Sequence, residues 1–185
     1  MNICVFGAAS NDISKDYIES CEEFGKKLAQ RGHVMVYGGG TGGVMGAIAR
    51  GATEGKGKII GISPEFFDHD GILYDKCDEL ILTDTVRERK RMMEDSAQSF
   101  AVLPGGVGTL DELFEVFSLR QLQVHSKPIA LYNRNGYFDG LISFVKNAIE
   151  EKFMEPACAE MVVAFNDADE LLDYLEKQSR VLLKF

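Results

Sequence analysis

Residues 100–112 read FAVLPGGVGTLDE, and this stretch decides the fold of the chain. Its first four residues are apolar and end at Pro104, which is typical of a short buried strand. Beyond the glycines, apolar residues recur at i, i+3, i+4 and i+7 and form one helix face: Leu110, Leu113, Phe114 and Phe117. The glycines are therefore expected to form the turn between a strand and a helix.

A turn of this kind can bind an anion. Glycines let backbone amides point inward without a Cβ in the way, and the unpaired amides and dipole of a helix start favour a phosphate. Glu112 and Glu115 lie about 200° and about 140° around the helix from Leu110, away from its apolar face. The sequence therefore predicts a phosphate site with two carboxylates beside it.

Two features of this helix allow other interpretations. Thr109 and Glu112 have the spacing of a T-x-x-E capping box, in which Glu112 would only reach back to the Thr109 amide. On spacing alone, the cap and the anion site both remain open. Val116 and Leu119 lie opposite the main apolar face, so the later turns are apolar nearly all round and are expected to be covered, for example by a second subunit.

Size and composition predict one ordinary globular domain covering residues 1–185, with 45% hydrophobic and 26% charged residues. The sequence contains no run of about 18 apolar residues and no basic segment ahead of a cleavable stretch. We therefore expect neither a membrane span nor a signal peptide, and a cytoplasmic location.

The cysteines and the net charge exclude other classes. Cys4, Cys21, Cys77 and Cys158 show no C-x-x-C spacing, so a zinc site or a disulfide framework is not expected. The formal net charge of −9 argues against nucleic-acid binding, which needs a basic surface. A small anionic ligand remains possible where positive charge is local.

Apolar runs alternate with amphipathic segments along the chain. Strands are expected at Ile3–Phe6, Val34–Tyr37, Lys58–Ile62, Leu80–Leu82, Phe100–Leu103, Pro128–Tyr132 and Met161–Phe165. Helices are expected at Ser14–Gln30, from Val44, after a cap at Asp84 or Thr85, after Thr109, from Tyr137 or Asp139 to Lys152, and after a cap at Asp167. This alternation predicts an α/β fold, a single Rossmann-like doubly wound parallel sheet with helices on both faces.

In such a sheet, ligands bind beyond the carboxyl ends of the strands. The loops expected there are Gly7–Ser10, Gly38–Gly43, the loop with Glu65, and Gly105–Thr109. Topology alone therefore predicts that they converge on one cleft. Gly38, Gly40 and Gly43 also spell G-x-G-x-x-G, but this pattern follows the second strand and lacks the acidic residue expected about 20 positions later, so a dinucleotide site is not favoured over close helix packing.

A basic run on the helix after Thr85 can contribute only in part to such a cleft. Arg87 and Arg91 share one face, whereas Arg89 lies about 200° away from Arg87. Basic runs on helices are usually solvated, and Lys90 can equally pair with Glu94. His125, next to the expected strand at Pro128, is interpreted as a polar loop residue and not as a catalyst.

Four stretches together resemble one known family: residues 104–112 as P-G-G-x-G-T-x-x-E, residues 37–46 (YGGGTGGVMG), Arg89–Lys90, and Gln121–Leu122 with Lys127–Pro128. On these residues the chain resembles the Lonely Guy (LOG) family, the cytokinin-activating nucleoside 5′-monophosphate phosphoribohydrolases. The resemblance covers nearly the whole chain. It implies hydrolysis of the N-glycosidic bond of AMP or an N6-modified AMP, by a homodimer, without metal, redox cofactor or pyridoxal phosphate.

The resemblance also implies roles for individual residues. Glu112 would stabilise the positive charge that develops at C1′ and guide water, Glu115 would position the sugar or the water, and Arg89 would orient the substrate or aid departure of the base. Substrate-binding residues would be Ser10, Gly39, Gly40, Glu65, Lys90, Gly105, Gly106, Val107, Gly108, Thr109 and Ser118. Ser118 stands where the family has a threonine that contacts substrate.

The alternative is a nucleotide-binding or molybdenum-cofactor carrier protein of the same fold. Such a carrier would not require Arg89, Glu112 and Glu115 together, so the retained set favours an enzyme. The label lysine decarboxylase, often attached to relatives of this family, finds no support, because the glycine turn has no lysine beside it for a Schiff base.

Overall fold

A computed structural model describes residues 1–69 and 71–182 of the chain. Its centre is a seven-stranded parallel sheet with the order β4-β3-β2-β1-β5-β6-β7. The strands are β1 (Asn2–Phe6), β2 (Val34–Tyr37), β3 (Ile59–Pro64), β4 (Glu79–Thr83), β5 (Ser99–Val102), β6 (Ile129–Tyr132) and β7 (Val162–Phe165). Each expected strand is present within a few residues of its expected bounds, and the α/β prediction is confirmed.

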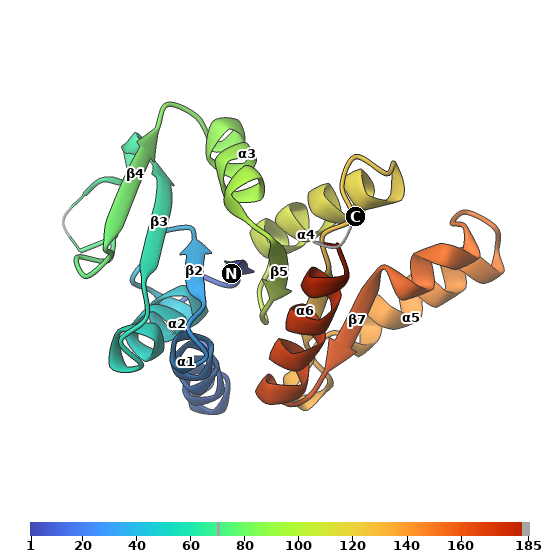
Figure 1. Cartoon of the computed structure of the whole chain (residues 1–185), viewed down its shortest axis with the longest axis horizontal. Helices are drawn as coiled ribbons and strands as arrows, with labels where there is room; N and C mark the ends of the chain where they lie inside the picture. The colour runs from blue at the N-terminus through green and yellow to red at the C-terminus, as the bar shows by residue number, and fades with distance from the viewer. Residues whose placement is uncertain (70, 183–185) are drawn as a thin grey trace.

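Helices cover both faces of this sheet (Figure 1). They are α1 (Lys15–Gln30), α2 (Gly43–Glu54), α3 (Val86–Ser96), α4 (Val107–Gln121), α5 (Asp139–Glu150) and α6 (Ala168–Leu182), with short 3-10 turns η1 (Glu65–Phe67), η2 (Arg134–Gly136) and η3 (Pro156–Glu160). One core lies between the sheet and α1, α2 and α6, and the other lies between the sheet and α3, α4 and α5. Among the described residues, no helix is long and apolar enough to cross a membrane.

Two of the expected helix caps are confirmed. The Thr85 hydroxyl accepts a hydrogen bond from the Glu88 amide (3.1 Å), and the Glu88 carboxylate accepts one from the Asp84 amide (3.1 Å). Asp167 accepts hydrogen bonds from the first amides of α6 at 2.8 and 3.1 Å. These bonds satisfy amides that a helix start leaves without partners.

Glycines let α1 and α2 pack backbone against backbone. A Cβ on Gly51 would overlap the carbonyl oxygen of Glu22, and one on Gly25 would overlap that of Ile48. The backbones of α1 and α2 touch at positions where side chains normally separate two helices. An added side-chain atom at these glycines would therefore push the helices apart.

Substitution of Gly51 by alanine is therefore expected to lower the free energy of unfolding by about 1–3 kcal/mol, the usual cost of overpacking. Gly140→Ala, on α5, is the matched control, because no atom lies within 4 Å of the added methyl group. This change should raise stability by roughly 0.5–1 kcal/mol through helix propensity. Urea unfolding of both variants measures the difference, and equal midpoints would contradict the packing argument.

Candidate active site

A cleft of about 630 Å³ lies at the carboxyl ends of β1, β2, β3 and β5. It is lined by Gly7–Asn11 after β1, by Gly38 and Gly40–Gly42 after β2, by Ser63, Pro64 and Phe67 at the end of β3, and by Gly106, Gly108 and Thr109 after β5. The four loops that topology predicted to converge are therefore brought together. Arg89 from α3 and Glu112 from α4 also line this cleft.

The start of α4 provides a candidate anion-binding site in the cleft. The helix begins at Val107 with Gly106 as its N-cap, and its first turn carries no acidic residue. No atom lies within 4 Å of where a Cβ would stand on Gly106 or Gly108, so the backbone is open toward the cleft. The Thr109 side chain also lines the cleft, although Thr109 is only 3% exposed. Unpaired amides and an unneutralised helix dipole favour a phosphate at this point.

Gly105 does not line the cleft, but the turn requires a residue without a side chain at this position. A Cβ on Gly105 would overlap the Thr109 hydroxyl and lie 3.0 Å from the Ala8 amide nitrogen. Its carbonyl oxygen accepts a hydrogen bond from the Tyr137 hydroxyl (2.8 Å). The glycine turn is thus held against β1 on one side and η2 on the other.

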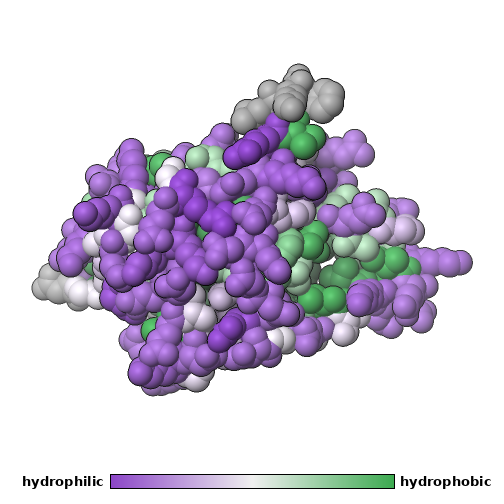
Figure 2. Space-filling model, turned by 60° about the horizontal axis from the view of Figure 1, so that its bottom comes forward, coloured by the Kyte–Doolittle hydropathy of each residue, from purple (hydrophilic) through white to green (hydrophobic). Residues whose placement is uncertain are grey.

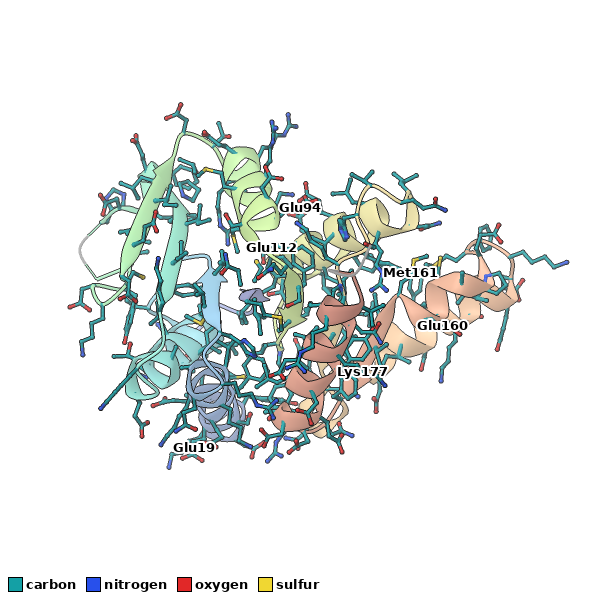
Figure 3. All side chains as sticks on the ribbon, viewed as in Figure 1. Glu19, Glu94, Glu112, Glu160, Met161 and Lys177 are labelled. Atoms are coloured by element: carbon teal, nitrogen blue, oxygen red, sulfur yellow. The ribbon has the colours of Figure 1, made fainter. Side chains whose placement is uncertain are left out.

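Arg89 and Glu112 form an ion pair inside the cleft, with 2.8 Å between Nη2 and Oε1. Their side chains are 16% and 9% exposed, and the Arg89 Nε also donates to the Ile62 carbonyl oxygen at 3.3 Å. The guanidinium lies where a Cβ on Gly38 would stand. Figure 3 shows Glu112 in the space between α3 and α4.

The capping interpretation of Glu112 is wrong. Because α4 starts at Val107, Thr109 lies inside the first turn and is not the N-cap, and the Glu112 carboxylate faces Arg89. Burial raises the pKa of the Glu112 carboxyl, while the Arg89 guanidinium opposes this rise. A carboxyl with a raised pKa, held beside a cation in a cleft, is typical of a functional site.

Lys90 and Glu115 contact each other and do not line the cleft. The Lys90 ammonium lies 2.8 Å from Glu115 Oε2 and 3.0 Å from Asp111 Oδ2, which joins α3 to α4. The pairing of Lys90 with Glu94 suggested by helical spacing does not form among the described residues. Arg87 and Arg91 are exposed, as expected for the solvated part of the basic run.

Of the other predicted site residues, some line the cleft and others lie outside it. Ser10 and Gly40 line the cleft, whereas Gly39 packs against Leu80, Ser63 and Leu73. Glu65 is exposed at the start of η1, and Val107 and Ser118 are exposed on α4 outside the cleft. His125 lies outside it too; its Nδ1 accepts from the Lys127 amide at 3.2 Å.

Several lining residues were not named individually from sequence, although Thr41 lies in a loop expected at the cleft: Asn11, Thr41, Met45, Phe67, Ile72 and Leu73. Asn11 and Thr41 lie in the loops that follow β1 and β2, and that position is the signal that could have identified them. The Asn11 side-chain oxygen accepts from the Gly43 amide at 3.1 Å and so links the loops after β1 and β2. The apolar residues Phe67, Ile72 and Leu73 carry no comparable signal.

Comparisons with known proteins identify the family of this chain. Residues 45–175 match a family model described as "Possible lysine decarboxylase". A probable cytokinin riboside 5′-monophosphate phosphoribohydrolase of Oryza sativa subsp. japonica is 37% identical over 177 residues, 96% of this chain and 71% of the relative. The chain belongs to the LOG family. A cytokinin riboside 5′-monophosphate phosphoribohydrolase of Arabidopsis thaliana, 35% identical over 98% of this chain and 87% of its own length, is a further LOG relative.

Solved structures share the fold of this LOG family member. The Moco carrier protein of Chlamydomonas reinhardtii superposes with a TM-score of 0.73 at 23% identity, over 100% of this chain and 98% of that protein. A molybdenum cofactor binding protein of Rippkaea orientalis gives 0.72 at 22% identity, over 95% of each chain. Likeness at this level of identity concerns the architecture alone.

The family description does not fit the cleft chemistry. A decarboxylase that uses pyridoxal phosphate needs a lysine to form the Schiff base. None of the described residues that line the cleft is a lysine, and Lys90 is occupied by two carboxylates outside it.

Proposed function

We propose that this protein hydrolyses the N-glycosidic bond of a nucleoside 5′-monophosphate, AMP or an N6-modified AMP, releasing the free base and ribose 5-phosphate. The observation that carries the proposal is the Arg89–Glu112 pair, with a buried carboxylate and a half-buried guanidinium, in the same cleft as the open start of α4. The named activity of the rice and Arabidopsis relatives supports it.

The phosphate is held first. Backbone amides at Gly106 and Gly108, with the Thr109 hydroxyl, bind the 5′-phosphate at the positive end of α4. The phosphate takes no part in bond breaking, so its binding energy positions the sugar carbon relative to Glu112. Gly105 contributes by allowing the turn to close on Thr109.

Bond cleavage then depends on Glu112. As the C1′–N bond breaks, its electron pair leaves with the base, which takes up a proton from solvent, and C1′ becomes cationic, a charge that a neighbouring carboxylate stabilises. Glu112 orients a water, whose oxygen bonds to C1′ while its proton passes to the carboxylate. Arg89 holds the carboxylate in place and assists departure of the base.

Residues outside the cleft act indirectly in this proposal. Lys90 bonds to Asp111 and Glu115 and fixes α3 against α4, which keeps Arg89 within reach of Glu112. A direct contact between Glu115 and the sugar requires this pair to open. The exposed Glu65 and Ser118 contribute, in this proposal, only at the edge of the bound substrate.

A panel of nucleoside monophosphates, assayed for free base and ribose 5-phosphate, tests the activity. Equal amounts of the two products are expected from AMP or an N6-modified AMP, and no release from the corresponding nucleosides, which lack the phosphate. Tight binding of a nucleotide with no product after long incubation would instead indicate a carrier protein of this fold.

We also propose a homodimer formed through α4 and α5. An apolar groove between these helices is lined by Leu113, Phe114, Phe117, Leu141, Val145 and Ile149. Phe144, also on α5, is 59% exposed. Apolar side chains gather in a hollow on the side of the molecule that carries α5 (Figure 2). Exposed apolar surface of this kind is typical of an interface.

Phe144→Asp is expected to convert the dimer to a monomer, because a carboxylate would be buried in an apolar contact. Light scattering coupled to gel filtration measures the mass. Val86→Asp is the matched control, because Val86 is also exposed (41%) but lies at the first turn of α3, where an acid is favourable. A monomeric parent protein would contradict the proposal.

The four cysteines are unpaired, three of them buried, which fits the reducing cytoplasm we propose for this protein.

A further inference from the structure

The peptide that joins Gly105 to Gly106 lies between the buried side of the glycine turn and the cleft. Gly105 is buried and does not line the cleft, whereas Gly106 is exposed and lines it. The peptide bond is trans, so its carbonyl oxygen, on Gly105, and its amide hydrogen, on Gly106, point in opposite directions. A group that binds the carbonyl oxygen therefore also sets the direction of the amide.

The Tyr137 hydroxyl binds this carbonyl oxygen, donating to it at 2.8 Å. The Gly106 amide, at the N-cap of α4, has no acceptor within residues 1–69 and 71–182. Because the carbonyl oxygen is directed toward Tyr137, this amide is directed to the opposite side, where Gly106 lines the cleft. A free amide at a helix start, directed into a cleft, is a donor for an anion.

Two adjacent glycines make this peptide easy to rotate. Neither residue has a Cβ that restricts its backbone dihedral angles. There is also space beside Gly106, because no atom lies within 4 Å of where its Cβ would stand. Rotation of the peptide would turn the Gly106 amide away from the cleft, and the hydrogen bond from Tyr137 opposes this rotation.

The Tyr137 ring is itself fixed by its neighbours. The Asn133 side chain, which is 8% exposed, accepts a hydrogen bond from the Phe138 amide at 2.7 Å and so fixes the backbone next to Tyr137. The ring packs edge to face against Tyr17 of α1, with 5.7 Å between centroids, and against Phe138, with 5.0 Å. The hydroxyl is therefore presented to Gly105 by a supported side chain.

We infer that Tyr137 is a positioning residue for the 5′-phosphate, whose hydroxyl binds the Gly105 carbonyl oxygen and thereby directs the Gly106 amide to the phosphate. The inference rests on the proposed function, which places the phosphate at the start of α4. Tyr137 does not line the cleft, so it acts on the ligand only through this peptide. Loss of the hydroxyl should weaken the contacts of the phosphate and leave those of the nucleoside unchanged.

Binding of formycin 5′-monophosphate and of formycin, compared by calorimetry, measures the contribution of the phosphate. In these analogues of AMP and adenosine a carbon–carbon bond joins the base to the sugar, so the proposed hydrolysis cannot consume them. Tyr137→Phe removes the hydroxyl and keeps the ring. The Kd of formycin divided by that of formycin 5′-monophosphate should fall about fivefold in this variant, the effect of losing one hydrogen bond. With AMP as substrate, KM should rise about fivefold and kcat should stay within about twofold of the parent value, because Arg89 and Glu112 are unchanged.

Tyr17→Phe is the matched control, because it removes a hydroxyl from the neighbouring ring, which contacts Tyr137 and lies outside the cleft. This variant should keep the parent ratio of Kd values. An unchanged ratio in Tyr137→Phe, or an equal fall in Tyr17→Phe, overturns the inference. If the parent protein releases no base from AMP, the proposed function fails, and the ratio of Kd values still tests the role of Tyr137 because it needs no catalysis.

Discussion

Glu112→Gln is expected to lower the release of adenine from AMP by roughly 10³-fold, within the range that general acid–base groups contribute. Glutamine keeps the shape of the side chain but can neither accept the proton of water nor stabilise the cationic sugar. Phosphate-dependent binding should survive, because we propose that it is made by Gly106, Gly108 and Thr109, which line the cleft. Steady-state base release and calorimetric AMP binding measure the two effects separately.

Asp111→Asn is the matched control for this variant. Asp111 precedes Glu112 on α4, but its carboxylate is exposed and faces Lys90. The pair between Lys90 and Glu115 remains in this variant and still joins α3 to α4. Base release should therefore change by less than about threefold, in line with the small worth of exposed ion pairs. A Glu112→Gln protein that hydrolyses AMP at the parent rate would remove Glu112 from the mechanism.

Arg89→Met should lower kcat/KM by about 10²-fold or more and also move its pH dependence. The guanidinium stabilises the Glu112 carboxylate, and burial already raises the pKa of that carboxyl. Without the positive charge, the carboxylate loses its partner and its pKa rises further. Because the ionised form of Glu112 is the active one in the proposed mechanism, the acid limb of the pH profile should shift to higher pH.

Arg89→Lys separates charge from geometry. Lysine keeps the positive charge, so the acid limb should stay near its parent position, while the loss of the planar fork still lowers the rate. Profiles of kcat/KM against pH for the two variants show whether the positive charge or the planar geometry of Arg89 sets the position of the acid limb. If the acid limb of Arg89→Met coincides with that of the parent, the limb does not belong to Glu112.

The strands and the cleft could be predicted from sequence because their signals are local. Runs such as Val34–Tyr37 are short and apolar, and parallel connectivity brings the loops after them to one edge of the sheet. The glycine turn after Val102 was predicted in the same way. These inferences need only periodicity and chain order.

The orientation of side chains on α3 and α4 could not be predicted in this way. Helical spacing allowed Lys90 to pair with Glu94, whereas the crossing of the two helices gives it Asp111 and Glu115. The role of Glu112 remained open for a similar reason, since the register of the first turn depends on where β5 ends and the helix begins. Ile72 and Leu73 are brought to the cleft by tertiary contacts, the bond from the Thr41 amide to the Ile72 carbonyl oxygen and the bridge between Gly40 and Leu73.

The close contact between α1 and α2 has a consequence for motion around the cleft. The loops that lead into these helices are bonded to each other, through Asn11 to the Gly43 amide and through the Met45 amide to the Ala8 carbonyl oxygen. The close contact between α1 and α2 leaves no space for one helix to slide along the other. We therefore expect the loops after β1 and β2 to move together as one unit. Any adjustment to a ligand is then expected on the other side of the cleft, where α3 and α4 are joined by ion pairs between charged side chains.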